Sequence, residues 1–251
     1  KPIYNQNGTI SKNWAPIQNF KLIENKSRNT YSFSFLFSQI ISKNAQVSFF
    51  VDFIKQKGWL ANPLQRVYFS DIENFYIGNP NSISVYTSDE NKDVFHLADD
   101  IERLPETRTK IPFGLRFNYF LSENFTLRSY YRFYTDNWGI KSHTLKFELP
   151  IKILNNFTLY PSYRFYHQSK ADYFKPYDQH LSSASYYTSD YDLSKFNSNQ
   201  VGFGIKYVDI FTKLGFWAIG LKSIDLNYSY YARDSNFKSE IVSLGFKFII
   251  D

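Results

Sequence analysis

The sequence predicts an all-β fold, an antiparallel up-and-down transmembrane β-barrel, from three observations. Aromatic residues are abundant, with 26 Phe and 21 Tyr among 251 residues, yet 21% of the residues are charged and the mean hydropathy is −0.41. Apolar residues recur at every second position, and short connections alternate with long ones. Strands with lipid on one face and water on the other produce this combination. The alternative, an aromatic-rich soluble β-sandwich, has no reason to alternate its loop lengths.

Composition excludes several other classes of protein. The chain has no Cys, which excludes disulfides and thiolate metal sites. No run approaches the roughly 18 consecutive apolar residues of a membrane-spanning helix. The net charge of +6 is dispersed along the chain, so nucleic acid is not an expected partner.

Period-two alternation defines the strands, because successive side chains of a strand point to opposite faces. Within Ile111–Leu121, Phe113 and Leu115 alternate with Gly114 and Arg116. The same pattern predicts nine strands: Tyr31–Phe37, Val47–Phe53, Ile111–Leu121, Phe125–Thr135, His143–Ile151, Phe157–His167, Val201–Tyr207, Ile224–Tyr230 and Val242–Ile250.

The connections between these strands fall into two sets. Ser42–Asn44, Ser122–Asn124 and Leu154–Asn156 are short, whereas residues 58–109 and 169–199 are long. Asp136–Lys141 is a short member of the second set, and Phe211–Leu221 is a longer connection on the side of the short turns. In outer-membrane barrels the short turns face the periplasm and the long loops face the outside of the cell. We therefore expect one barrel domain over residues 1–251, in the cell outer membrane, with extracellular long loops and a periplasmic C-terminus.

Strand parity predicts that this barrel is incomplete. If the last of nine strands ends in the periplasm, the first also runs towards the periplasm, and residues 1–26 are an extracellular loop or the end of a missing N-terminal part. Bacterial single-chain barrels have an even number of strands. We therefore expect further strands upstream of this sequence.

The polar positions of the alternation predict a charged lumen. The lumen-facing charged residues are Arg116, Arg128, Arg132, Lys146, Glu148, Arg164, Lys206, Asp225 and Lys247. One interpretation is a water-filled pore that favours anions. The other is that these charges pair across strands and fill a narrow barrel. Bulky aromatics at positions such as Tyr130 and Tyr160 favour the filled lumen. On the opposite side, Trp138, Tyr131, Tyr163 and Tyr230 are predicted anchors at the membrane interface.

No constellation of residues predicts catalysis or a bound metal. Ser142, His143 and Asp136 are the only local Ser/His/Asp set, but adjacent strand residues point to opposite faces. No catalytic residue and no cofactor is therefore expected. Weak calcium candidates are the loop carboxylates Asp99, Asp100, Asp190 and Asp192, for which ordinary solvation is the simpler interpretation.

Several segments resemble one known family. They are Asp99–Pro105, Tyr131–Thr144, Tyr160–Tyr166, Tyr187–Phe196 and Ile241–Phe248. The resemblance is to an uncharacterised outer-membrane family, domain of unknown function 3570, of the Bacteroidota type, and it extends from Asn29 to the C-terminus. It implies an outer-membrane β-barrel and implies no activity.

The sequence is compatible with three functions. The first is a non-catalytic barrel that serves as an accessory or structural subunit of an outer-membrane complex. Its expected partners are outer-membrane lipid and other outer-membrane proteins or lipoproteins. The alternative is a passive, porin-like channel for small, anionic solutes, which the basic inner face favours. An outer-membrane enzyme is the last.

Overall fold

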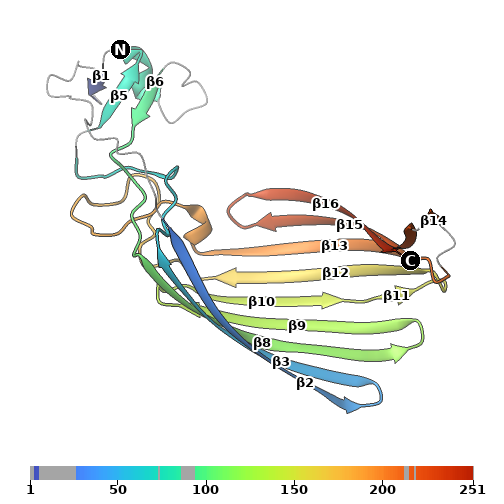
Figure 1. Cartoon of the computed structure of the whole chain (residues 1–251). Helices are drawn as coiled ribbons and strands as arrows, with labels where there is room; N and C mark the ends of the chain where they lie inside the picture. Colours follow the sequence, from blue (N-terminus) through green and yellow to red (C-terminus); the bar gives the residue numbers. More distant parts are fainter. Residues whose placement is uncertain are drawn as a thin grey trace. The chain divides into compact units, whose positions relative to one another are not determined.

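The computed structural model describes residues 3–5, 27–72, 74–85, 94–211, 215–217 and 219–250 (Figure 1). The chain divides into two compact units. We call residues 31–55, 109–171 and 195–251 the sheet unit, and residues 1–30, 56–108 and 172–194 the loop unit. The prediction of one barrel domain over the whole chain stays a prediction.

Nine long strands form one large sheet. They are β2 (Arg28–Ser42), β3 (Ala45–Gly58), β8 (Thr107–Ser122), β9 (Phe125–Asp136), β10 (Lys141–Glu148), β12 (Phe157–Gln168), β13 (Phe196–Val208), β15 (Ile219–Arg233) and β16 (Lys238–Ile250). They lie side by side in chain order, and neighbouring strands from β8 to β16 pair antiparallel. The all-β antiparallel prediction is confirmed, and eight of the nine predicted strands each lie within a longer observed one.

One predicted strand is interrupted. His143–Ile151 is divided between β10 and the short β11 (Ile151–Lys152), which pairs with β12 and β9. The break falls at Leu149 and Pro150. Proline has no backbone N–H to donate to the ladder, so regular pairing stops there.

The predicted short connections are tight turns at one end of the sheet (Figure 1). Residues 43–44 join β2 to β3, and residues 123–124 join β8 to β9. At the same end, residues 209–218 include the two-residue strand β14 (Gly215–Phe216), which pairs with β15. At the opposite end the connections after β3 and β12 are long, but residues 137–140 and 234–237 join β9 to β10 and β15 to β16 by short turns, so the predicted alternation holds only in part.

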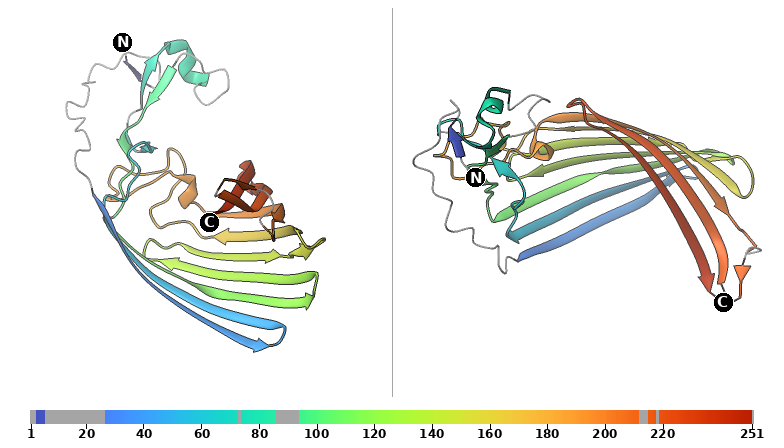
Figure 2. Two further views of the ribbon diagram at one scale, coloured as in Figure 1. Left: turned by 45° about the vertical axis from the view of Figure 1, so that its right-hand side comes forward. Right: turned by 90° about the horizontal axis from the view of Figure 1, so that it is seen from above.

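The curved sheet has two edge strands, β2 and β16 (Figure 2). In the described part of the chain these two strands are not hydrogen-bonded to each other. Barrel closure therefore stays a prediction. The expectation for residues 1–26 lies outside the described residues except for residues 3–5, which form β1 (Ile3–Asn5).

The loop unit has a fold and a core of its own. It contains β1, β5 (Phe75–Gly78) and β6 (Val94–Leu97) in one sheet, and β4 (Arg66–Val67) paired with β7 (Asp100–Ile101). Two 3-10 helices, η1 (Pro80–Val85) and η2 (Tyr191–Leu193), complete it. Its buried apolar clusters consist of Val67, Phe69 and Tyr187, and of Tyr76, Ile83 and Val94. Among the described residues, no helix is long and apolar enough to span a membrane.

Candidate functional site: the polar face of the sheet

The strand register sorts side chains onto two faces of the sheet. The first, which we call the polar face, carries Arg132, Lys146, Ser162, Gln200 and the side chains in register with them. Along this face Arg116, Tyr130, Lys146 and Arg164 are successive cross-strand neighbours on β8, β9, β10 and β12. Three cationic side chains therefore share one row across four strands.

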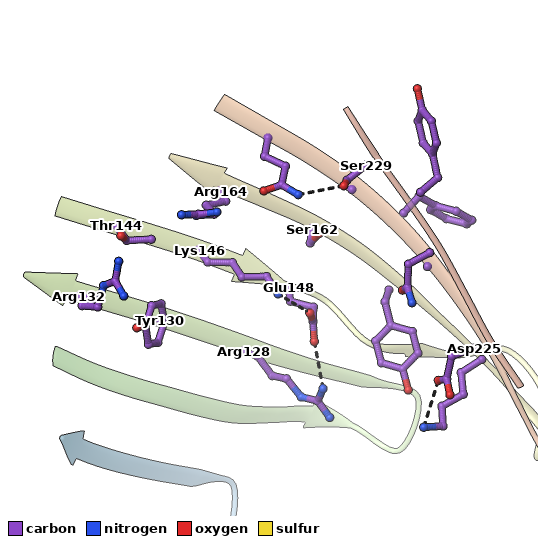
Figure 3. Close-up of a pocket in the computed structure, with 18 residues that line it drawn as sticks. Arg128, Tyr130, Arg132, Thr144, Lys146, Glu148, Ser162, Arg164, Asp225 and Ser229 are labelled. Atoms are coloured by element: carbon purple, nitrogen blue, oxygen red, sulfur yellow. Dashed lines mark hydrogen bonds and ion pairs between the residues drawn. The ribbon is translucent and has the colours of Figure 1, made fainter. Parts of the chain in front are cut away.

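The polar face is hollowed. A hollow of about 660 Å³ lies against β9, β10, β12, β13 and β15 (Figure 3). Gly202 and Gly204 present no side chain there, and a Cβ at Gly204 would lie 2.2 Å from the Asn227 side-chain oxygen. The other lining residues are Arg128, Tyr130, Arg132, Thr144, Lys146, Glu148, Tyr160, Ser162, Arg164, Gln200, Phe203, Lys206, Asp225, Asn227, Tyr228 and Ser229. Of these, Phe203 and Tyr228 pair with each other and are assigned by the strand register to the opposite face.

The sequence predicted charged residues on this face, and in the structure most of the nine predicted lumen-facing residues lie close together. Seven of the nine predicted lumen-facing residues line the 660 Å³ hollow. Arg116 lines a smaller hollow of about 320 Å³. Lys247 pairs with Ser223 of β15. Ser223 lies two residues before Asp225 and points to the same face, so Lys247 is also on the polar face. That this face encloses a lumen stays a prediction.

Ion pairs neutralise only part of the charge. Glu148 lies 3.0 Å from Arg128 and 2.9 Å from Lys146, and both cations come from the strands that flank or contain it. Lys206 lies 3.2 Å from Asp225 on the neighbouring strand. Arg128–Glu148 and Lys206–Asp225 are cross-strand pairs of the kind that one interpretation of the sequence expected, whereas Lys146 and Glu148 lie on the same strand.

Three arginines of the polar face have no carboxylate partner among the described residues: Arg116, Arg132 and Arg164. The Arg116 guanidinium instead lies 5.4 Å from the Phe50 ring centre, and that of Arg164 lies 5.7 Å from the Tyr166 ring centre. Aromatic rings attract a cation without cancelling its charge. The hollow is therefore positively charged on balance.

The opposite face, which we call the apolar face, is exposed and hydrophobic. Leu159, Ile205, Leu226 and Leu244 form one cross-strand row on β12, β13, β15 and β16. Leu226 is 45% exposed and Leu244 is 59% exposed. A continuous apolar surface of this kind marks contact with something other than water.

The predicted interface anchors divide into two groups. Tyr131, Tyr163 and Tyr230 are exposed on the apolar face. The Tyr131 hydroxyl pairs with His143 Nδ1 at 2.8 Å, and the Tyr163 hydroxyl donates to the Asn199 side-chain oxygen at 2.7 Å. Trp138 differs from the expectation, since it is only 2% exposed and its ring packs inside the protein.

The Ser/His/Asp set is not assembled. Ser142 is buried in register with Tyr134, while His143 lies exposed against Tyr131. Asp136 Oδ1 accepts from the backbone N–H groups of Trp138 and Ile140, which shapes the turn after β9. Asp136 therefore has a structural role in this hairpin.

The calcium candidates also have structural partners. Asp99 accepts from the Phe69 backbone N–H, Asp100 from the Tyr187 hydroxyl, and Asp190 caps η2 through Asp192 N–H. Within the described ranges, no three His or carboxylate groups are placed to hold a metal ion.

The loop unit also contains a buried polar network that the sequence did not predict. Thr188, fully buried, donates to Glu102, which also accepts from the Asn62 backbone N–H. Burial raises the pKa of Glu102, against the lowering effect of these two hydrogen bonds. His180 Nε2 pairs with the Thr188 carbonyl at 2.9 Å, and burial lowers the pKa of that imidazole. Thr188 is 86 positions from Glu102 and 8 positions from His180 in the sequence, so no local pattern signals the network.

Polar, uncharged residues of the hollow were missed as well. Thr144, Ser162 and Gln200 line it, and parity from Lys146 and Arg164 assigns the first two to the same face. Thr144 is only 4% exposed, and its hydroxyl has no hydrogen-bond partner in the described structure.

Comparison with known proteins adds one family and one distant structure. A family model described as "Protein of unknown function (DUF3570)" matches residues 3–245. None of the curated proteins matches the chain. A solved structure titled "Bacterial polysaccharide outer membrane secretin" is 8% identical with a TM-score of 0.35, over 88% of this chain and 78% of that one. A similarity this low supports no statement about the function of this chain.

Proposed function

We propose that this chain, which belongs to the DUF3570 family of proteins of unknown function, forms a non-catalytic outer-membrane β-barrel through which small anionic solutes pass. One observation carries the proposal. A single sheet exposes an apolar face on one side and a hollowed, cationic face on the other.

The apolar face fits contact with lipid. Leu226, Leu244 and Phe203 are about half exposed, and each lies in register with another apolar residue. In water, exposing this area costs roughly 25 cal/mol for each Å² of apolar surface. In a bilayer the same side chains are solvated by acyl chains, as in the apolar band of membrane barrels.

The polar face fits a path for anions. The sequence favoured a filled lumen, but the hollow of about 660 Å³ supports passage of solutes instead. Arg116, Arg132 and Arg164 leave a positive charge that Glu148 and Asp225 do not neutralise. Cationic side chains that line a pore raise the local concentration of anions and repel cations.

The proposal requires the sheet to close in the membrane. The edge strands β2 and β16 would otherwise expose backbone N–H and C=O groups to hydrocarbon, where no water can bind them. We therefore propose closure between these edges with further strands, as strand parity predicts. The tight turns then face the periplasm and the loop unit faces outwards.

Planar-bilayer recording of the full-length protein tests the channel. We expect an anion-selective conductance, and Arg164→Gln should reduce the selectivity because it removes an unpaired cation from the hollow. Lys152→Gln, an exposed lysine of β11 outside the lining set, is the matched control. Absence of conductance in the wild-type protein would remove the proposal.

A second candidate is an accessory subunit of an outer-membrane complex. It is favoured by exposed aromatic side chains on the loop unit: Phe95, Tyr177, Tyr186 and Tyr191. Such surfaces mark protein–protein contacts. Isolation in mild detergent should then recover other outer-membrane proteins or lipoproteins, and a joint Tyr186→Ser and Tyr191→Ser change should release them. Recovery of the barrel alone would contradict this candidate.

A further inference from the structure

We infer that the polar face holds a saturable binding site for one small oxyanion, a carboxylate or a phosphate group, formed by Arg132, Thr144 and Arg164. This inference rests on the proposed function, because it names the class of anion that the hollow selects. It assigns a discrete site within the larger hollow.

The strand register brings the three residues together. Arg132 on β9 is the cross-strand partner of Thr144 on β10. On the other side of Thr144, its partner on β12 is Tyr166, and Arg164 lies two residues before Tyr166 on the same face. Thr144 thus stands on the strand between the two arginines, as Figure 3 also shows.

Two polar atoms at this point lack partners. The Thr144 hydroxyl and Arg132 Nε are both shielded from water, and neither has a hydrogen-bond partner in the described structure. Thr144 as a whole is 96% buried, since 4% of its surface is exposed. Buried polar groups of folded proteins are almost always hydrogen-bonded. Both residues line the hollow, so a small rotation of either side chain towards it would let a bound oxyanion supply the missing partner.

The charge at this point is also unbalanced. Lys146, next to Arg164 in register, is held 2.9 Å from Glu148, which also binds Arg128. Farther along the hollow, Lys206 has Asp225 at 3.2 Å. Arg132 and Arg164 have no such carboxylate within the described residues, so most of the excess positive charge lies at the Thr144 end.

The chemistry of this set favours an oxyanion over a halide. A guanidinium group presents N–H donors in a planar fork that matches two oxygens of a carboxylate or phosphate. A threonine hydroxyl can donate to a further oxygen. Two forks and one hydroxyl suit a multi-oxygen anion, whereas a spherical chloride ion uses neither the fork nor the spacing of the donors.

Titration calorimetry on the detergent-solubilised full-length protein tests the site. The probes are inorganic phosphate and succinate, with chloride as the comparison, at constant low ionic strength. We expect saturable binding of at least one oxyanion probe. Arg132→Gln should weaken it about thirtyfold, because a charged partner is lost. Thr144→Val should weaken it about tenfold, because one hydrogen bond to a charged group is lost.

Two controls separate binding from folding and from general charge. Thr144→Val keeps the shape of the side chain and orphans no protein group, so its thermal unfolding should match the wild type. Lys247→Gln removes one positive charge from the same face on β16, three strands away from β12 in the sheet order, and should leave the affinity unchanged.

The outcomes distinguish the site from the channel. Absence of saturable binding, equal binding of chloride, or unchanged affinity in Arg132→Gln would each overturn the site. If the protein conducts anions but binds no oxyanion, the channel stands and the site is refuted. If it binds oxyanions through Arg132 and Thr144 but does not conduct, the site stands and the channel is refuted.

Discussion

The loop unit and the sheet unit distribute apolar residues in opposite ways. In the loop unit Val67, Phe69 and Tyr187 pack together and are 6% exposed or less. In the sheet unit Val201 and Val242 are 59% and 67% exposed, on the face opposite the charges. One unit thus has the organisation of a protein in water, and the other that of a protein whose outer surface meets lipid.

The two units also differ in where they place their polar residues. The loop unit buries Glu102, Thr188 and His180 in a hydrogen-bonded network. The sheet unit keeps charged residues such as Arg128 and Glu148 on an open, hollowed face. The comparison indicates that the loop unit has a buried core of its own, whereas the apolar side chains of the sheet unit stay exposed and would be covered by lipid in the proposed barrel.

The largest expected effect is the loss of a core aromatic in the loop unit. Phe69 packs edge-on against Tyr187, with ring centres 5.0 Å apart, so Phe69→Ala should destabilise the loop unit by about 3–5 kcal/mol. Phe203→Ala on the apolar face of the sheet should cost far less, because Phe203 is half exposed. Hydrogen exchange of the loop-unit amides in Phe69→Ala, and of the sheet-unit amides in Phe203→Ala, measures the two costs. Equal losses of stability at the two positions would contradict the conclusion that apolar residues are buried in the loop unit and exposed in the sheet unit.

A charge on the apolar face should have the next largest effect. Leu244 is at the middle of β16 and in the apolar row. Leu244→Arg should therefore destabilise the protein folded in vesicles by about 2–4 kcal/mol. The adjacent Ser243→Arg, which points to the polar face, is the matched control and should cost less than about 1 kcal/mol. Urea titration of both variants in lipid vesicles gives the two values. A similar cost for both would contradict the assignment of lipid to one face.

Acid should destabilise the loop unit through His96. Its Nδ1 pairs with the Tyr177 hydroxyl and its Nε2 with the Asn74 side chain. Burial lowers the pKa of His96 from 6.5 to about 4. Between these values the unfolded chain binds a proton that the folded unit does not, so the stability present above pH 6.5 is lost as the pH falls towards 4.

The variant His96→Gln isolates this effect, because it keeps polar groups at the position without titrating. Its stability should vary less than that of the wild type between pH 6.5 and 4. Asp99 and Glu102, whose pKa values burial raises, act in the opposite direction in both proteins and cancel in the difference. Parallel pH profiles of thermal unfolding for the two proteins would refute the assignment to His96.

The smallest expected effect concerns selectivity in the sheet unit. Glu148 binds both Arg128 and Lys146, so Glu148→Gln should free two cations and raise the anion-to-cation permeability ratio about twofold. Reversal potentials in a salt gradient measure this ratio. A shift towards cations would mean that the polar face does not line the conduction path.

Much of the sheet unit could be predicted from the sequence, because its signal is local. Alternation gave nine strands and assigned Arg164 and Leu226 to opposite faces. The break at Pro150 was not predicted, although a residue without a backbone N–H marks it. Thr144 was missed because a short polar side chain adds little to a pattern of charged and apolar residues.

The loop unit could not be predicted, because its contacts join distant segments. Phe69 bridges to His180, and Arg103 bridges to Tyr187. The paired residues are separated in sequence by residues 109–171 of the sheet unit, and no periodic pattern signals the pairings. Their stability comes from packing of specific side chains, such as Val67 against Phe69 and Tyr187, which a single sequence does not reveal.

In the proposed barrel the two faces of each strand meet different solvents, and spin labels on β15 can show this difference residue by residue. The chain has no Cys, so single cysteines at 226, 227, 228 and 229 can be labelled without background. In a lipid nanodisc, labels at Leu226 and Tyr228 should be accessible to oxygen, and labels at Asn227 and Ser229 to a water-soluble nickel complex. Loss of this period-two alternation, with all four positions equally accessible to the nickel complex, would contradict the claim.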